Sequence, residues 1–317
     1  MKHFKILLFS LVFSRFLRFK RLIFQKFTKC DAIKFVIFFK YIVVTHGQIY
    51  SRKRKRNMKN VKINSFERLD DLQTKNNLRL IQNPDWFCFG VDAVLLSHFA
   101  SKTVKKGANV LDLCTGNGIV PILMSEKTDA EKIVGLEIQE AVAEMAERSV
   151  SLNNLEEKVS IQCGDLKNAE EIFGREMFDN ITCNPPYKEA TGGLKNSSDT
   201  VTIARHEVMC NLRDIIEVSA KCLKPYGKLC MVHRPERLAD IICLMRENRI
   251  EPKRLWFIHP KKSKTANIIL IEGAKYGKPK LFLEPPLYVY EENGECSKEI
   301  DEIYGRIKLS CKEGKNK

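Results

Sequence analysis

The stretch NVLDLCTGNGIVPILMSEKT, residues 109–128, contains three kinds of segment in a short length of chain. Its first six residues are mostly apolar, as in a strand buried inside a sheet. Its last eleven have helical spacing, and Pro121 falls in the first turn, where a missing N–H costs little. Between them, Gly116 and Gly118 allow a positive φ and a close approach of a ligand to the backbone. The stretch therefore predicts a strand, a glycine loop and a helix in that order.

The chain beyond residue 128 repeats this alternation of apolar runs and helix-period segments. Such alternation is typical of a parallel sheet covered on both faces. Right-handed crossovers then predict a doubly wound, Rossmann-like α/β fold whose sheet is mostly parallel. The expected strands are 109–114, 132–138, 159–165, 178–184, 228–234, 254–260 and 266–274, and the expected helices are 118–128, 139–154, 212–223 and 237–248. Residues after Pro285 mix acids and bases without a period, so we expect them to be peripheral or frayed.

The basic charge of the chain is concentrated in its first residues. The formal net charge is +15, but residues 1–57 hold fifteen of the 54 Lys and Arg residues and one of the 39 acids. The remaining chain has 39 basic and 38 acidic residues, so a polyanion must bind it through local patches. We expect residues 1–57 to be a basic, Phe-rich extension outside the folded unit, with translation starting at Met58. Residues 58–305 would then form one domain, followed by a charged tail over 306–317.

Neither a membrane span nor a metal site is expected. The apolar runs ILLFSLVF and AIKFVIFF are shorter than the ~18 to 20 residues that cross a bilayer. The eleven cysteines are odd in number and include no CxxC pair, which indicates reduced thiols, a cytoplasmic protein and no structural zinc. The basic extension leaves open a non-enzymatic protein that binds RNA or a membrane surface. The sequence does not predict an oligomeric state.

The glycine loop excludes two common nucleotide sites. A nicotinamide fingerprint needs a small residue at its third conserved position, where this chain has Pro121. A P-loop needs Gly-Lys-Ser/Thr, which does not follow.

Acidic residues follow the next two expected strands. Glu137 lies about 20 residues beyond Gly118, where a carboxylate can accept both hydroxyls of a ribose. Asp165 follows the third strand and can accept from an adenine amino group. Taken singly, Glu137 can equally be a helix N-terminal charge and Asp165 an N-cap. Their order at successive strand ends suits an adenosine that carries a cationic tail.

The fourth strand runs into NPPY, residues 184–187, after the apolar ITC. Adjacent prolines cannot donate backbone hydrogen bonds, so they end the strand and stiffen the turn. With DLCTGNG (112–118), LEI (136–138) and GDL (164–166), this motif resembles the class I S-adenosylmethionine-dependent methyltransferases that methylate amino groups conjugated to a planar system. The glycine loop departs from the commoner DxGxGxG pattern at residues 113–115.

The resemblance implies an antiparallel final strand in the otherwise mostly parallel sheet, and an S-adenosylmethionine site. Residues 112–118 would hold the methionine part, Glu137 the ribose and Asp165 the adenine. The full implied set of cofactor-binding residues is Asp112, Cys114, Thr115, Gly116, Gly118, Glu137, Ile138, Asp165, Leu166 and Asn184.

The resemblance also implies that Asn184, Pro185, Pro186 and Tyr187 are catalytic. An exocyclic adenine amine is a poor nucleophile because its lone pair is delocalised into the ring. If the Asn184 side-chain oxygen and the Pro185 carbonyl accept its two N–H bonds, the lone pair can turn toward the methyl donor. Pro186 would stiffen the turn and Tyr187 would stack on the base, which must be unpaired or flipped to reach the pocket.

A narrower resemblance covers residues 58 to about 305. ERLDDLQ (67–73), LRLIQNPDWFCFGVDAVLLSHFA (78–100) and ARHE (204–207) are similar to the bacterial tRNA valine adenine-N6 methyltransferases, which implies a tRNA substrate modified at the anticodon-loop adenine next to the anticodon. In the second of these segments, Phe87 and Phe89 can cover the cofactor and Asp92 can cap a helix, or the segment can be an ordinary amphipathic lead-in helix. Candidate RNA contacts are Tyr187, Lys188, Lys195, Arg205, Lys261, Lys262 and Lys264.

Three other methyltransferase classes are weighed against this one. A protein glutamine methyltransferase fits the same motif but usually has an N-terminal helical substrate domain. An rRNA guanine-N2 enzyme favours NPPF. A pyrimidine C5 enzyme needs a Pro-Cys nucleophile, and this chain contains no such pair.

Overall fold

The central sheet of the protein carries every strand expected from the sequence. The computed structural model describes residues 59–86, 88–185 and 211–305, all within one unit that spans Arg56–Lys317. In this part of the chain the main sheet has nine strands in the order β10-β8-β9-β7-β6-β3-β4-β5, with β11 paired to β8. Its strands are β3 (Asn109–Leu113), β4 (Lys132–Glu137), β5 (Val159–Cys163), β6 (Phe178–Cys183), β7 (Leu223–His233), β8 (Ile250–His259), β9 (Ile268–Lys275), β10 (Phe282–Leu283) and β11 (Leu287–Tyr288).

Strands β5, β4, β3, β6 and β7 are parallel, and β9 runs antiparallel between β7 and β8. The predicted doubly wound, mostly parallel fold with an antiparallel strand near the end of the chain is confirmed. The five parallel strands and β8 all end at the same edge of the sheet, which we call the carboxyl edge.

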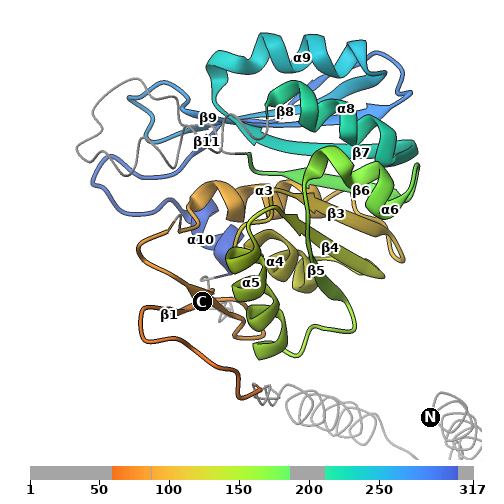
Figure 1. The fold of residues 1–317 in the computed structure, drawn as a ribbon. Helices are drawn as coiled ribbons and strands as arrows, with labels where there is room; N and C mark the ends of the chain where they lie inside the picture. The colour runs from red at the N-terminus through yellow and green to blue at the C-terminus, as the bar shows by residue number, and fades with distance from the viewer. Residues whose placement is uncertain (1–58, 87, 186–210, 306–317) are drawn as a thin grey trace, which may run out of the picture. The chain divides into compact units, whose positions relative to one another are not determined.

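Helices cover both faces of the sheet (Figure 1). Two large cores lie on either side, one including α3 and α4 residues and the other α8 and α9 residues. The helices are α3 (Val91–Ser101), α4 (Ile119–Lys127), α5 (Glu140–Leu152), α6 (Ala169–Phe173), α8 (Leu212–Cys222), α9 (Leu238–Glu247) and α10 (Lys298–Tyr304), with short 3₁₀ turns η1 (Leu166–Asn168) and η2 (Pro235–Arg237). Helix α8 begins at a capping box formed by Asn211 and Asp214.

The chain enters the domain through a hairpin followed by a helix, so residues 78–100 contain the strand β2 as well as the expected lead-in helix, α3. Strands β1 (Arg68–Asp71) and β2 (Arg79–Gln82) pair antiparallel, and Ile81 of β2 packs on α5. The Ser149 hydroxyl and the Asn153 side-chain oxygen, at the end of α5, accept the Ile81 and Arg79 N–H groups at 3.0 and 2.9 Å. The expectation that Asp92 caps the next helix is wrong, because α3 begins at Val91 and its N-cap is Gly90.

The described residues after Pro285, up to residue 305, correct another expectation, because they are neither peripheral nor frayed. Strand β11 extends the sheet beside β8, and α10 begins at the N-cap Ser297, whose hydroxyl accepts from the Ile300 N–H. Ile300 is 1% exposed, and the Ile303 carbonyl accepts from Lys127 Nζ at 3.1 Å. These elements could not be predicted from the sequence because each places only one or two apolar residues in the core.

The strand expected at 228–234 also begins earlier, at Leu223. The chain turns at Tyr226, which has φ 65°, and the pairing between β6 and β7 shifts there. Residues around Tyr226 therefore form an irregularity inside a longer strand.

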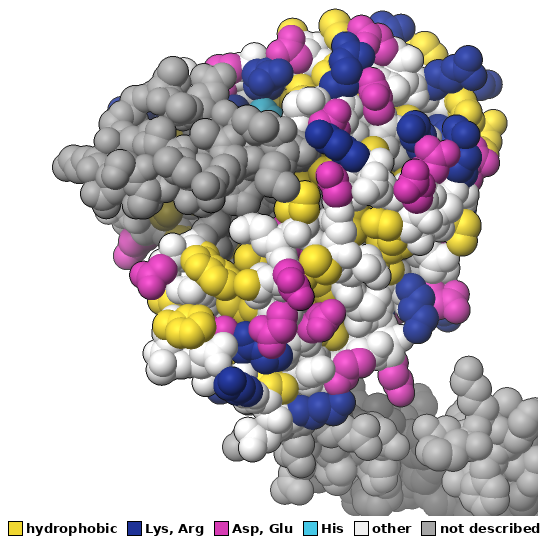
Figure 2. Space-filling view, in the orientation of Figure 1, with side chains coloured by type: hydrophobic (Ala, Val, Ile, Leu, Met, Phe, Trp, Pro, Cys, Tyr) yellow, Lys and Arg dark blue, Asp and Glu magenta, His cyan; other side chains and the backbone are white. Residues whose placement is uncertain are grey.

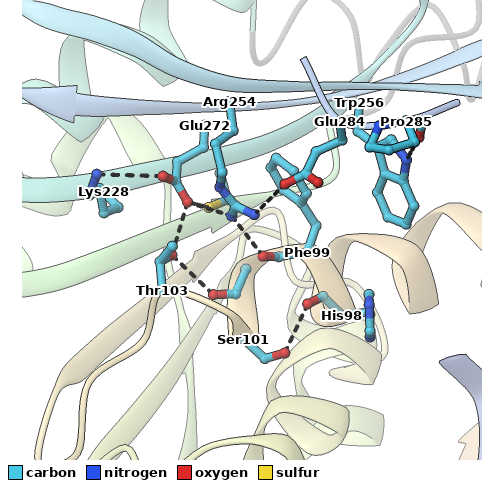
Figure 3. Close-up of polar contacts among 12 residues, drawn as sticks. His98, Phe99, Ser101, Thr103, Lys228, Arg254, Trp256, Glu272, Glu284 and Pro285 are labelled. Carbon is cyan, nitrogen blue, oxygen red and sulfur yellow. Dashed lines mark hydrogen bonds and ion pairs between the residues drawn. The ribbon is translucent and has the colours of Figure 1, made fainter. Parts of the chain in front are cut away.

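A buried charge network fixes the last strands to α3 (Figure 3). Glu272 of β9 is 1% exposed, and its carboxylate accepts from Arg254 Nη2 at 2.7 Å and from the Thr103 hydroxyl at 2.9 Å. The same guanidinium donates to the Phe99 carbonyl at 3.0 Å and lies 4.1 Å from the centre of the Phe99 ring. Burial raises the pKa of the Glu272 carboxyl, but Arg254, Lys228 and the Thr103 hydroxyl together outweigh burial and hold the pKa below its usual value. Glu284, from the segment between β10 and β11, completes the network through Arg254 Nη1.

The surface of the described residues carries both signs of charge. Lys and Arg side chains alternate with Asp and Glu over the face shown in Figure 2, as expected for a body without a general basic field. No helix in the described ranges is long and apolar enough to cross a membrane. None of the eight cysteines in these ranges forms a disulfide.

The ion pair between Glu67 and Arg148 is expected to anchor the segment before the hairpin to α5. Glu67 accepts from both Arg148 Nη atoms, at 2.6 and 2.8 Å, and its side chain is 2% exposed. The hydrogen bond from Arg148 lowers the pKa of Glu67 to about 2 despite the opposing effect of burial. We expect Glu67→Gln to lower the free energy of unfolding at pH 7 by about 2 to 3 kcal/mol, measured by urea denaturation.

The same pair predicts a pH dependence. A depressed native pKa stabilises the fold fully above the unfolded value, 4.5, and the contribution is lost as pH falls through 2. The difference between the wild type and Glu67→Gln should therefore shrink between pH 5 and about pH 2. The control is Glu144→Gln, which removes an exposed partner of the same Arg148 and should cost about 0.5 kcal/mol or less. Equal losses in the two variants would contradict the anchoring role.

Candidate active site

The acidic and amide residues expected to be functional meet at the carboxyl edge. Asp112 is the fourth residue of β3, Glu137 is the last residue of β4, and Asp165 follows β5 by two residues. Asn184 comes directly after β6, the neighbour of β3 on its other side. Because these four strands are parallel and adjacent, the fold brings the residues together as the sequence predicts.

Asp112 is the buried centre of this edge. Its side chain is 1% exposed and accepts hydrogen bonds from two hydroxyls, Thr115 Oγ1 at 2.7 Å and Thr182 Oγ1 at 2.5 Å. Burial raises the pKa of Asp112 to about 7; the two hydroxyl bonds act in the opposite direction, and the charge of Glu137 adds to the rise. Thr182 is the Cα partner of Asp112 on β6 and lies two residues before Asn184. Asp112 therefore ties the glycine loop to the strand that carries the NPP residues.

The glycine loop folds over the end of β4. The Thr115 side chain sits so close to Gly135 of β4 that a Cβ there would lie 2.7 Å from Thr115 Oγ1. Cys114 and Gly116 both have φ 56°, a left-handed conformation that costs a cysteine more than a glycine. A Cβ on Gly116 would meet nothing within 4 Å, so this face of the loop is open to a ligand, whereas a Cβ on Gly118 would meet Ala146 at 3.3 Å.

Glu137 holds the glycine loop in place through a hydrogen bond. Its Oε2 accepts the Gly116 N–H at 2.9 Å, and its Oε1 accepts the backbone and side-chain N–H groups of Gln139 at 3.0 and 3.2 Å. The side chain is 5% exposed. Because a carboxylate has about four acceptor positions, one position on Oε2 remains for a ligand, and release of the Gln139 side chain would free a second.

Asp165 caps a 3₁₀ turn. One of its carboxylate oxygens accepts the Lys167 N–H at 2.9 Å at the start of η1. The N-cap interpretation is therefore confirmed for one oxygen, and the half-buried side chain keeps acceptor capacity for a ligand. Leu166 is buried beside it, and Ile138 is half-buried after β4.

Asn184 and Pro185 follow directly after β6, where the chain leaves the buried strand. We call these two residues the Asn184–Pro185 exit. Asn184 is half-buried and Pro185 is buried. In the described ranges the Asn184 side chain has no hydrogen-bond partner, so both its oxygen and its nitrogen are available. Pro186, Tyr187, Lys188, Lys195 and Arg205 lie outside the described residues, and their expected roles stay predictions.

Gln82 is a residue that the sequence did not single out. It is 1% exposed, and its side-chain oxygen accepts from the Phe89 N–H at 3.1 Å and from Asn117 Nδ2 at 2.9 Å. Gln82 thus joins the hairpin, the Phe89 segment and the glycine loop. A polar residue that ends the apolar run LRLIQ is the only signal for it in the sequence. Phe87 is not described, and Phe89 packs against the core on the α3 side of the sheet.

The three lysines expected to contact RNA lie in the loop between β8 and β9, at the same carboxyl edge. Lys262 and Lys264 are exposed, and Lys261 Nζ donates to the Glu292 carbonyl at 3.2 Å. The structure separates them from Asn184 by three strand spacings, because β7 and β9 lie between β6 and β8. No group of side chains in the described ranges has the composition of a metal site.

Comparisons with known proteins agree with this arrangement. A family model described as the methyltransferase small domain matches residues 77–245, from β2 to α9. The chain belongs to this family. Among solved structures, one described as a predicted O-methyltransferase from Agrobacterium tumefaciens has a TM-score of 0.55 and 21% identity, and covers 68% of this chain and 95% of its own. Family and fold together confirm a methyltransferase of class I, the S-adenosylmethionine-dependent type expected from the sequence.

Two curated relatives carry the same specific name. A protein from Porphyromonas gingivalis is 27% identical over 212 residues, which is 66% of this chain and 79% of the relative. One from Tolumonas auensis is 24% identical over 223 residues, which is 69% and 90% of the two chains. Both are described as tRNA1(Val) (adenine(37)-N6)-methyltransferase. The similarity to this group that was seen in the sequence is confirmed.

The Thr182 hydroxyl is expected to stabilise the fold, because it donates a hydrogen bond to the buried Asp112 carboxylate. Thr182→Val keeps the shape of the side chain but leaves a buried oxygen of Asp112 without its donor, which should destabilise this methyltransferase by about 1 to 3 kcal/mol in urea unfolding. Thr182→Ser is the matched control because it keeps the hydroxyl and loses only a methyl group. If the serine variant is the less stable of the two, the packing of the methyl group matters more than the hydrogen bond.

Proposed function

We propose that this methyltransferase transfers a methyl group from S-adenosylmethionine to the exocyclic amine of an unpaired adenine in tRNA, at the anticodon-loop position named in its relatives. The observation that carries the proposal is the Asn184–Pro185 exit from β6, fastened to the glycine loop through Thr182 and Asp112. The names of the relatives support the choice of tRNA and of the N6 atom.

The described residues fit the cofactor. Gly116 offers open space above the loop, Glu137 keeps an acceptor position for a ribose hydroxyl, and Asp165 keeps one for an adenine amino group. These residues, with Asp112, Cys114, Thr115, Gly118, Ile138 and Leu166 as their supports, form the proposed cofactor site. When bound there, S-adenosylmethionine supplies an electrophilic methyl group on a sulfonium sulfur.

The residues of the chain then activate the substrate by position. The Asn184 side-chain oxygen and the Pro185 carbonyl can each accept one N–H bond of an exocyclic amine. Two such acceptors orient the amine and leave its lone pair free to attack. The side chain of Asn184 is uncommitted in the described ranges, as this role requires. We propose that Tyr187 stacks on the target base and that Pro186 stiffens the turn.

The experiment is incubation of the purified protein with labelled S-adenosylmethionine and total tRNA, followed by nucleoside analysis. We expect label in N6-methyladenosine. Label in N2-methylguanosine, or in a glutamine of an added translation factor and not in RNA, would replace the proposal by one of the alternative methyltransferase classes.

Asn184→Ala tests the assigned role of the amide. We expect methyl transfer to fall about 100- to 1,000-fold, while the dissociation constant of S-adenosylmethionine changes several-fold at most. Asn293→Ala, at an exposed asparagine, is the control and should match the wild type. A comparable loss of transfer and of cofactor binding would argue against a role confined to the amine.

We also propose that residues 58–305 contain the whole catalytic unit and act in the cytoplasm, where tRNA is found. Removing residues 1–57 should leave the rate of methyl transfer to tRNA within about two-fold of the full chain, because the proposed cofactor and catalytic residues all lie between Asp112 and Tyr187. Loss of RNA binding and of transfer on this deletion would favour a protein that acts through its basic extension.

A further inference from the structure

Two aromatic side chains meet at the carboxyl edge beyond the proposed site. His259 ends β8, and its partner in the parallel pairing with β11 is Tyr288. Their ring centres are 5.3 Å apart and the rings are inclined by 47°. Leu287 and Val289, on either side of Tyr288, are buried, so strand alternation turns Tyr288 to the opposite face, where it is half-buried. No contact of the proposed catalytic or cofactor site explains this pair.

The backbone around the two rings fixes them in place. His259 Nδ1 lies 2.9 Å from the Lys264 carbonyl oxygen. Because a carbonyl oxygen can only accept, Nδ1 carries a hydrogen, and Nε2 takes no part in this contact. Arg234, at the end of β7, donates to the Asn267 carbonyl at 2.9 Å and thereby ties the loop between β8 and β9 to the neighbouring strand end.

Positively charged lysine side chains lie beside the two rings. Lys262 Nζ is 5.9 Å from the centre of the Tyr288 ring. Neither Lys262 nor Lys264 has an ion-pair partner in the described part of the chain, and both are exposed. The nearby acid Glu292 accepts from the Ser263 N–H and hydroxyl, each at 3.2 Å, so its carboxylate braces the loop instead of pairing with these lysines.

We propose that His259, Tyr288 and Lys262 form a stacking platform for one unpaired nucleobase of the RNA substrate, with Lys264 placed to contact a phosphate. An aromatic surface beside free lysines is the chemistry that proteins use to hold unpaired nucleotides, because every base has a π-face. We call these four residues the β8 platform. The inference rests on the proposed function, since it concerns a neighbour of the adenine held at Asn184.

The distance between the two places suits a short unpaired segment. Strands β6 and β8 are three spacings apart in the sheet, which is about 14 Å at 4.7 to 4.9 Å per spacing. A few unpaired nucleotides cover that span, whereas a base stacked on Tyr288 cannot also be paired in a duplex. The β8 platform would therefore select RNA whose target adenine lies in a loop.

The test uses an RNA hairpin with an unpaired loop that contains the target adenine and, at each other loop position in turn, the fluorescent base 2-aminopurine. Stacking on an aromatic ring quenches this base. For the full chain we expect strong quenching at one loop position close to the target adenine. Tyr288→Ala should abolish that quenching and weaken hairpin binding between about 5- and 150-fold in fluorescence anisotropy.

Two variants control for damage to the fold. Tyr288→Phe keeps the ring and should bind the hairpin within about two-fold of the wild type. Tyr226→Ala removes a tyrosine that is 73% exposed near the opposite end of β7, and it should change neither quenching nor affinity. All variants should bind S-adenosylmethionine as the wild type does.

A salt titration tests the charged part of the β8 platform. Replacing Lys262 or Lys264 with Ala should lower the slope of log affinity against log salt by about 0.7, the value for one phosphate contact on a single strand. An unchanged slope in both variants would remove the lysines from the RNA contact.

The outcomes separate this inference from the proposed function. If the wild type methylates the hairpin and Tyr288→Ala binds and quenches like the wild type, the platform is overturned and the methyl transfer stands. If the wild type binds and quenches without methylating adenine, the platform stands and the proposed reaction fails. If no loop position is quenched and a protein substrate binds in a Tyr288-dependent way, the surface serves a protein partner and the RNA inference is wrong.

Discussion

A single buried carboxylate holds the functional edge of this methyltransferase together. Asp112 is out of contact with water, and its oxygens are occupied by hydroxyls from two different segments, the glycine loop and β6. A buried carboxyl without such donors is costly, so the two segments are held at the spacing that satisfies it. The loop proposed to bind the cofactor and the Asn184 exit therefore keep a fixed separation. The proposed mechanism depends on such a separation, because it assigns the main part of catalysis to positioning.

Parallel topology explains why the candidate site could be predicted from local motifs. Residues at the ends of adjacent parallel strands meet whatever the details of packing, so the motifs that contain Asp112, Glu137, Asp165 and Asn184 could be placed together from their positions at strand ends. Their order along the chain was enough to propose an adenosine site.

Other residues depend on register across the sheet, which local patterns do not reveal. Thr182 matters because it stands opposite Asp112, and Gly135 because Thr115 folds onto it. Gln82 matters because it ends a hairpin strand that reaches the glycine loop, and no strand was predicted from the sequence between residues 68 and 82. Tyr288 was missed because β11 is too short to show a period. The residues that support the site were thus harder to predict than the residues proposed to carry the chemistry.

The attachment of the hairpin to α5 has a consequence for synthesis on the ribosome. Glu67 and Arg148 are 81 residues apart in sequence, and Arg79 and Ile81 find their acceptors 74 and 68 residues later. The hairpin is therefore made long before the helix on which it rests, and an isolated two-stranded hairpin is marginal in water. Its apolar side has no partner while β3 and β4, the first two strands of the main sheet, are synthesised. The nascent chain is most exposed to chaperones and proteases during that interval, and the emergence of α5 ends it.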